Sequence, residues 1–139
     1  MLCSFVLVAN TFANAPIVNE KVLKSFDQTF TNAEGVKWEE FENHYVVSFI
    51  RSGVQLKVNY DKKGEMLSSI SYYTPNNLPL YLQNKLRKEY PGTSLYGVTE
   101  VMYNETVTYF VKIQNEKNWI TVKIDPSGNH EIYKKYKKA

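Results

Sequence analysis

Apolar and polar residues alternate along two pairs of neighbouring segments. The alternation is typical of strands that bury one face, because successive side chains of a strand point to opposite sides. The second pair repeats the first at an offset of 64 positions. The apolar positions are Tyr45, Val47, Phe49, Leu56, Val58 and Tyr60 in the first pair, and Tyr109, Val111, Ile113, Ile120, Val122 and Ile124 in the second. The pattern therefore predicts the same two paired strands twice.

A helical spacing precedes each strand pair. Large apolar residues recur every four positions, and the second set follows the first at an offset of 60. Residues four apart lie on one face of a helix, so each segment can bury a single apolar stripe. The first set is Val22, Phe26 and Phe30, and the second is Leu82, Leu86 and Tyr90.

The ends of both helices are marked by residues that cap or stop a helix. We expect Asn19 to cap the first helix, with Glu20 in its first turn. We expect Asn77 to cap the second helix, two residues before Pro79, which suits a first turn. The second helix should stop at the Tyr-Pro-Gly stretch of residues 90–92, and the first at residues 30–35.

Each strand pair is followed by an Asp-x-x-Gly sequence. Asp61 with Gly64, and Asp125 with Gly128, suit the first and fourth positions of a type I turn. Pro126 supplies a preset φ at the second position of the later turn. Each turn contributes one carboxylate, whereas calcium takes several oxygen ligands. We therefore interpret both sequences as structural hairpin turns, with glycines in a left-handed conformation.

These patterns predict an α+β fold of two tandem helix-plus-antiparallel-strand repeats that form one sheet, with the helices on one face. The first repeat would cover residues 16–75 and the second residues 76–139, with the boundary near residues 74–79. Each repeat would carry two further strands. These are residues 36–41 and 65–73 in the first repeat, and 98–103 and 129–136 in the second.

The N-terminal segment is typical of an exported protein. Residues 1–15 contain no charge, and an apolar block at residues 5–9 leads to the small-residue pattern Ala13-Asn14-Ala15. We interpret them as a signal peptide whose true start lies upstream, cleaved after Ala15 or Ala13; an ordinary buried strand is the alternative. The protein is then expected to be periplasmic or secreted. The apolar block falls far short of the roughly 20 residues that span a bilayer.

The charge distribution argues against nucleic acid as a partner. The net charge is +3, with 17 basic and 14 acidic residues, but four of the lysines lie within residues 134–138. Without these four, 13 basic residues stand against 14 acidic ones. A nucleic-acid-binding domain is expected to carry basic residues through its folded part.

Few residues suggest catalysis or cofactor binding. Cys3 is the only cysteine and lies in the expected signal peptide. His44 and His130 do not correspond under the 64-residue offset, and neither has a metal-ligand partner at the usual spacing. The acidic residues Glu39 and Glu40 are expected on a solvated strand edge. No phosphate loop or nucleophile elbow is present. We therefore expect no enzyme, no catalytic residue, no cofactor and no metal site.

Four stretches resemble the β-lactamase-inhibitor-like, PepSY-like exported bacterial proteins. They are "FTNAEGVKWEE", "YVVSF" with "VQLKVNYDKKGE", "LPLYLQNKLRKEYPGTSLYGV", and "YFVKI" with "WITVKIDPSGN". The resemblance covers nearly the whole chain after Pro16 and implies tandem helix-plus-sheet repeats behind a signal peptide, with function generally unassigned. The chain departs from the family pattern at Thr31, where the second copy has Pro91. The inhibitor itself relies on disulfides within its repeats, so inhibition of β-lactamase is not implied.

The sheet face turned away from the helices provides the candidate binding residues. The two copies differ there, since Phe110 replaces Val46 and Trp119 replaces Gln55 under the offset of 64. Large aromatic residues are enriched at the centres of interfaces. We expect Val46, Ile50, Phe110 and Trp119 to bind a protein or peptide, making the chain an exported, non-enzymatic binding module. The alternative is a structural protein of the cell envelope that forms homo-oligomers through the same face; a loop or the C-terminal segment could also cover these residues.

Overall fold

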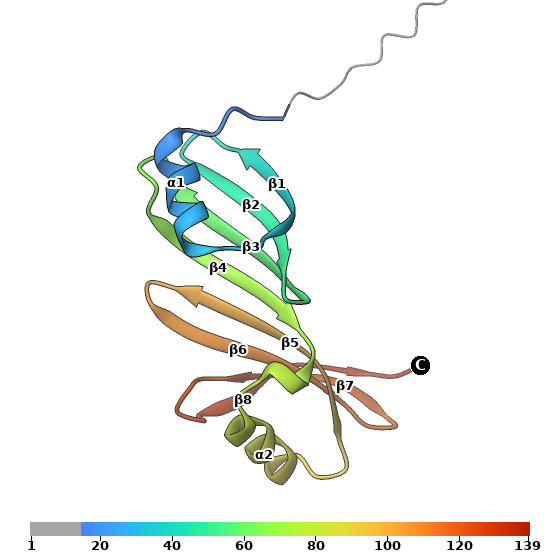
Figure 1. Ribbon diagram of the computed structural model, residues 1–139. Coiled ribbons are helices and arrows are strands. Elements are labelled where there is room, and N and C mark those ends of the chain that lie inside the picture. The colour runs from blue at the N-terminus through green and yellow to red at the C-terminus, as the bar shows by residue number, and fades with distance from the viewer. Residues whose placement is uncertain (1–14) are drawn as a thin grey trace, which may run out of the picture.

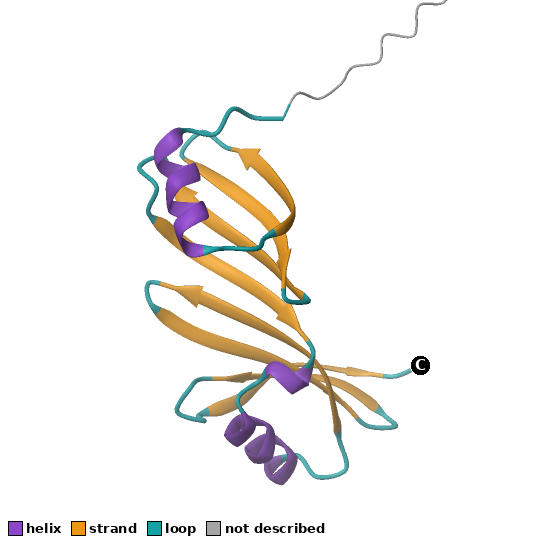
Figure 2. Ribbon diagram, in the orientation of Figure 1, coloured by secondary structure: helices purple, strands orange, loops and turns teal. Residues whose placement is uncertain are grey.

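The computed structural model describes residues 15–139 and shows an α+β fold. The expected signal peptide, residues 1–15, lies outside this part except for Ala15. A helix followed by four strands occurs twice along the chain (Figures 1 and 2). The elements are α1 (Glu20–Thr29), β1 (Glu34–Glu40), β2 (His44–Arg51), β3 (Val54–Asp61), β4 (Met66–Tyr73), η1 (Pro75–Asn77), α2 (Leu80–Glu89), β5 (Ser94–Tyr103), β6 (Thr106–Gln114), β7 (Asn118–Ile124) and β8 (His130–Lys137).

The strands form one antiparallel sheet in which they follow each other in sequence order, from β1 at one edge to β8 at the other. The predicted α+β class and single antiparallel sheet are confirmed. The two strand pairs with the strongest alternation are β2 with β3 and β6 with β7. Between them, β4 pairs with β5 although η1 and α2 lie between these strands in the sequence. Figure 1 shows this order, with α1 beside the first four strands and α2 beside the last four.

Both helices cover the same face of the sheet, as the strand register shows. Val58 lies opposite Ser69, and Ser69 lies opposite Met102, so these three side chains share one face. Alternation places Tyr73 and its partner Val98 on that face too. Val58 is buried in the core that includes α1, whereas Val98 is buried in the core that includes α2. The opposite face of the sheet carries no helix among the described residues, and we call it the open face.

Each helix has its own hydrophobic core. Under α1, the ring of Phe26 contacts Trp38 and Phe49 edge-on, with centroids 5.3 Å and 5.1 Å away. Under α2, Leu82 and Leu86 are fully buried. The first core comprises Val22, Phe26, Tyr45, Val47, Phe49, Val58 and Tyr60, and the second Leu78, Leu82, Leu86, Val98, Tyr109, Val111, Ile113, Ile120, Val122 and Ile124. The alternating residues of the sequence thus form the buried face of the sheet.

The helix caps agree with the sequence for α1 and differ for α2. The Asn19 side chain accepts hydrogen bonds from the backbone N–H groups of Lys21 (2.8 Å) and Val22 (3.4 Å), as predicted. The prediction that Asn77 caps α2 is wrong, because Asn77 ends the short helix η1 and Pro79 is the cap residue. Leu78 precedes a proline, which disfavours the helical backbone conformation, and it is extended at φ −71° and ψ 140°. The helix therefore begins only at Leu80.

The Asp-x-x-Gly turns fix each helix to its sheet. The predicted left-handed glycines are present, with φ +90° at Gly64 and +91° at Gly128. Ser25 of α1 donates to the carbonyl oxygen of Gly64 (2.6 Å). Tyr81 of α2 donates to the carbonyl oxygen of Pro126 in the corresponding turn. Both turns are therefore structural and lie against the helices.

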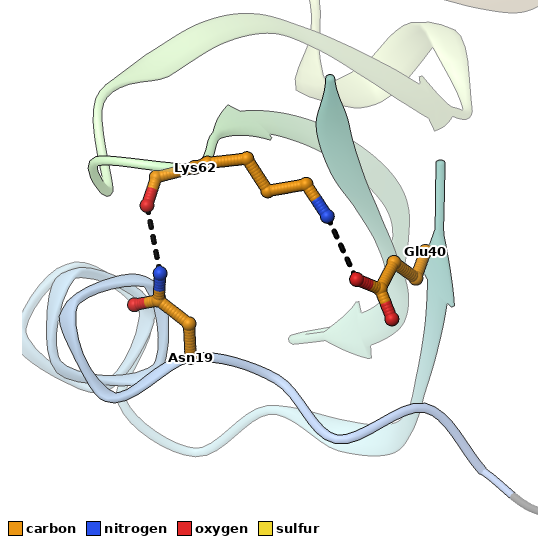
Figure 3. A network of polar contacts seen from close by, with 3 residues as sticks. All are labelled: Asn19, Glu40 and Lys62. Atoms are coloured by element: carbon orange, nitrogen blue, oxygen red, sulfur yellow. Dashed lines mark hydrogen bonds and ion pairs between the residues drawn. The ribbon is translucent and has the colours of Figure 1, made fainter. Parts of the chain in front are cut away.

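Lys62 extends this connection to the edge strand β1 (Figure 3). Its carbonyl oxygen accepts a hydrogen bond from the Asn19 side chain, and its ammonium group lies 2.8 Å from Oε1 of Glu40. The same ammonium lies 4.0 Å from the centroid of the Tyr45 ring. The hydrogen bond from Lys62 lowers the pKa of Glu40. A single turn residue thus joins the start of α1, the sheet and β1.

Candidate binding face

The alternation of β2, β3, β6 and β7 determines which residues reach the open face. Ile120 is buried under α2, so its neighbour Trp119 must point the opposite way. Trp119 is indeed 41% exposed. The four predicted residues Val46, Ile50, Phe110 and Trp119 all lie opposite partners that face away from the helices. The structure therefore places all four on the open face.

These four residues differ in how accessible they are. Ile50 is 42% exposed, while Phe110 is half-buried. Val46 is only 8% exposed, although it points away from the helices. Val46 therefore offers little surface to a partner.

The four residues also do not form one cluster. Ile50 of β2 and Phe110 of β6 are connected by a row of residues that lie opposite one another on neighbouring strands. The residues between them are Gln55 of β3, Tyr72 of β4 and Thr99 of β5, and we call this the central row. Trp119 is the second residue of β7, next to the β6–β7 turn, and lies opposite Gln114 on one side and Tyr136 on the other. The open face thus carries a central row and a separate aromatic group around Trp119.

The aromatic group around Trp119 contains residues that the sequence did not reveal. Tyr96 contacts the Trp119 ring nearly edge-on, with centroids 5.5 Å apart and an angle of 70°. Tyr96 lies at a register shift of β5 between Leu95 and Gly97, which turns its side chain to the open face. It also precedes the predicted strand of residues 98–103, so simple alternation gave no signal for it.

A second aromatic pair lies beside the central row. Phe110 and Tyr133 meet at 64° with centroids 5.1 Å apart. Tyr133 is exposed and lies where β8 shifts register against β7, between Ile132 and Lys134. Tyr72 of the central row is a further exposed aromatic residue of the open face. Its outward position could have been predicted from the sequence, because it alternates with residues of β4 that face α1. Together these contacts extend the exposed aromatic surface beyond the predicted residues.

The C-terminal segment covers part of Trp119. The ammonium group of Lys138 lies 4.2 Å from the centroid of the indole and donates to Oε1 of Gln114 (3.0 Å). The backbone N–H of Lys138 donates to the carbonyl oxygen of Lys117 (2.8 Å), which fixes the segment. Such a cation over an indole is favourable by about 0.5–1 kcal/mol at an exposed site. The predicted cover by the C-terminus is therefore present in part, and a large fraction of the indole remains accessible.

The histidines and acidic residues take part in local contacts. His44 stacks on Phe41 with ring centroids 4.6 Å apart, and His130 Nδ1 lies 2.9 Å from the hydroxyl of Tyr90. The Tyr73 hydroxyl donates to Oε2 of Glu100 (2.6 Å), and burial together with this carboxylate raises the pKa of Tyr73. Within residues 15–139 there is no group of three or more His, Cys, Asp or Glu side chains arranged to hold a metal ion. Nor does a helix of this part have the length and apolarity that crossing a membrane requires.

Several solved structures from Bacteroides share this architecture. A BLIP-like protein from Bacteroides fragilis superposes with a TM-score of 0.66 at 17% identity, covering 88% of this chain and 87% of that one. The chain has the BLIP-like fold. The resemblance seen in the sequence, to β-lactamase-inhibitor-like proteins, is thereby confirmed for the fold.

Two further structures share this BLIP-like fold. A DUF2874 family protein from Bacteroides uniformis gives a TM-score of 0.62 at 22% identity, covering 86% of this chain and 88% of that one. A protein from Bacteroides eggerthii described as "putative periplasmic" gives 0.63 at 16% identity, covering 88% and 90%. No family model and no curated protein matches the sequence. At these identities the likeness concerns the fold alone.

Proposed function

We propose that this BLIP-like protein is an exported, non-enzymatic binding module that recognises a protein or peptide through its open face. The observation that carries the proposal is the exposed aromatic surface on the open face, where Tyr96 and Trp119 lie close together. Exposed aromatic groups of this kind mark interaction sites, since large apolar side chains on a surface are otherwise scattered singly. Tyr and Trp are also the residues enriched in interface centres.

The fold comparisons support the same proposal. One neighbour is named as BLIP-like, a name that refers to a protein inhibitor and hence to a protein-binding fold. Another is described as periplasmic, which fits the export expected from residues 1–15. Inhibition of β-lactamase is not part of the proposal, because the cysteines for internal disulfides are missing after Cys3.

We further infer that the chain is a tandem repeat of residues 16–75 and 76–139. The helices support this, since α1 and α2 both have 10 residues and both contact an Asp-x-x-Gly turn. The main difference lies in the first hairpin of each repeat. The paired residues Glu100 and Tyr109 of β5 and β6 are 9 residues apart, whereas the corresponding Glu40 and Tyr45 of β1 and β2 are 5 apart, and these four extra residues account for the larger strand offset. Duplication would also explain why the buried faces agree while the open faces differ, as only the latter would adapt to a partner.

The proposal is tested with Trp119→Ala in affinity capture from a cell-envelope extract. The matched control is Leu80→Ala, because Leu80 is an exposed apolar residue of α2 and does not belong to the open face. We expect one protein to be retained by the wild type and by the control, and to be lost with Trp119→Ala. Because the indole is partly exposed, we expect the variant to lose about 1 kcal/mol of stability, well below the roughly 3–5 kcal/mol of a core tryptophan.

The same experiment addresses the alternative role in assembly. If the protein instead forms homo-oligomers through the open face, no other protein should be captured. Light scattering of the purified protein should in that case show self-association that Trp119→Ala weakens. Partner capture that is insensitive to Trp119→Ala would remove the open face from the proposal.

A further inference from the structure

The lysines of the open face are concentrated on its C-terminal half. Lys112 of β6 and Lys134 of β8 both lie opposite Thr121 of β7, so they occupy one row. Lys123 lies in the adjacent row, opposite Phe110. All three side chains are exposed. Glu131, which lies opposite Lys123, is the one acidic residue that faces outward on β6, β7 and β8. Three lysines therefore accompany a single carboxylate, and this half of the face is positively charged.

These lysines have no ion-pair partner in the part of the chain that the structure describes. Within residues 15–139 the one ion pair is that of Lys62 with Glu40. The N-terminal half of the open face is different, because Lys37 and Lys57 are accompanied there by the carboxylates of Glu39 and Asp61. The excess positive charge is therefore confined to the half that also carries the exposed aromatic rings.

The lysines alternate in space with these rings. Lys123 is the cross-strand neighbour of Phe110, and Lys134 lies with its ammonium group 5.6 Å from the Tyr133 ring. Trp119 lies two residues before Thr121 on β7, on the same face, and the ammonium group of Lys138 lies over its ring. A ligand lying along this surface would meet apolar and cationic positions in turn.

We propose that the C-terminal half of the open face binds an acidic protein segment, in which carboxylates meet Lys112, Lys123 and Lys134 while apolar side chains cover Phe110 and Trp119. This inference rests on the proposed function and adds the chemistry of the partner. Charge complementarity selects such a partner, since interfaces place opposite potentials against each other. A second copy docked through this same half of the face about a two-fold axis would bring like charges together, which disfavours that occupant.

The test measures binding of fluorescein-labelled copolymers by fluorescence anisotropy. The probe is a random copolymer of Glu and Tyr, and the matched probe is a random copolymer of Lys and Tyr. An oligothymidylate serves as the nucleic-acid probe. The test variant reverses Lys112, Lys123 and Lys134 to Glu. The control variant reverses Lys24, Lys63 and Lys88, which are equally exposed but lie outside the open face, so both variants have the same net charge.

We expect the Glu-Tyr copolymer to bind and the Lys-Tyr copolymer not to bind. The open-face variant should weaken binding by about tenfold or more, as the loss of several surface ion pairs predicts, while the control variant should change it by less than about threefold. Binding should also weaken as salt rises, because exposed charges are screened. Equal weakening in both variants, absence of binding, or tighter binding of the oligothymidylate would overturn the acidic partner. The proposed function would survive these results if capture of a partner still depended on Trp119.

Discussion

Replacing Gly64 by alanine tests how the turns hold the helices. Gly64 has φ +90°, which L residues rarely adopt, and a Cβ atom there would lie 2.7 Å from the backbone oxygen of Lys21 in α1. Gly53 is a matched control, because its φ of +76° is similar and a Cβ there would meet nothing within 4 Å. Gly128 is intermediate, since its Cβ would meet only the side chain of Lys85 at 3.1 Å.

The magnitudes follow from these surroundings. The left-handed conformation alone costs an L residue about 1–2 kcal/mol, and alanine recovers part of this through the entropy that glycine loses on folding. We therefore expect about 1 kcal/mol for Gly53→Ala. In Gly64→Ala the turn must also move away from α1, which disturbs the hydrogen bonds from Ser25 to Gly64 and from Asn19 to Lys62. At about 0.5–1.5 kcal/mol each, these bring the expected loss to about 2–4 kcal/mol.

The assay is equilibrium unfolding in urea, followed by circular dichroism, for the wild type and the three variants. The expected order of destabilisation is Gly64→Ala above Gly128→Ala, with Gly53→Ala equal to or below the latter. A flexible lysine side chain can move aside in Gly128→Ala, whereas the backbone of α1 cannot. If Gly64→Ala were no more destabilising than Gly53→Ala, the turn would not constrain α1 and the reasoning would be wrong.

Three further predictions concern single residues. Tyr60 is 1% exposed and its hydroxyl has no hydrogen-bond partner within the described chain, and burial raises its pKa to about 12. Tyr60→Phe should therefore raise the free energy of unfolding in urea by about 1 kcal/mol. A decrease would show that the hydroxyl does have a hydrogen-bond partner. Glu105 has φ +61° in a two-residue hairpin after Asn104, so Glu105→Gly should raise the free energy of unfolding by about 0.5–1 kcal/mol, whereas Glu105→Ala should not. Hydrogen bonds from the side chain and backbone of Asn129 lower the pKa of Asp125 below its ordinary value. The stabilising contribution of Asp125 is therefore complete above the unfolded-state pKa of about 3.9 and is lost as the pH falls through the folded-state value. An NMR titration of Asp125 that finds no lowering of its pKa would refute this.

The sequence by itself determined the elements and the orientation of their faces. The alternation around Val47, Val58, Val111 and Val122 reflects burial of one sheet face, and that pressure acts on every second residue, so it is visible in one dimension. The cap at Asn19 was visible because it depends on residues within one helical turn. For the same reason the outward position of Trp119 followed from its neighbour Ile120.

Other features depended on the tertiary structure. Tyr96 and Tyr133 reach the open face through register shifts in β5 and β8, and a shift depends on how a strand meets its neighbour. Val46 points outward as predicted but is covered there, which depends on the packing of side chains from adjacent strands. The contact of Lys138 with Trp119 arises because the C-terminal segment extends past the end of β8 toward the β6–β7 turn. Local periodicity reports only which side of a strand a residue occupies, whereas accessibility on that side is decided by neighbours distant in sequence.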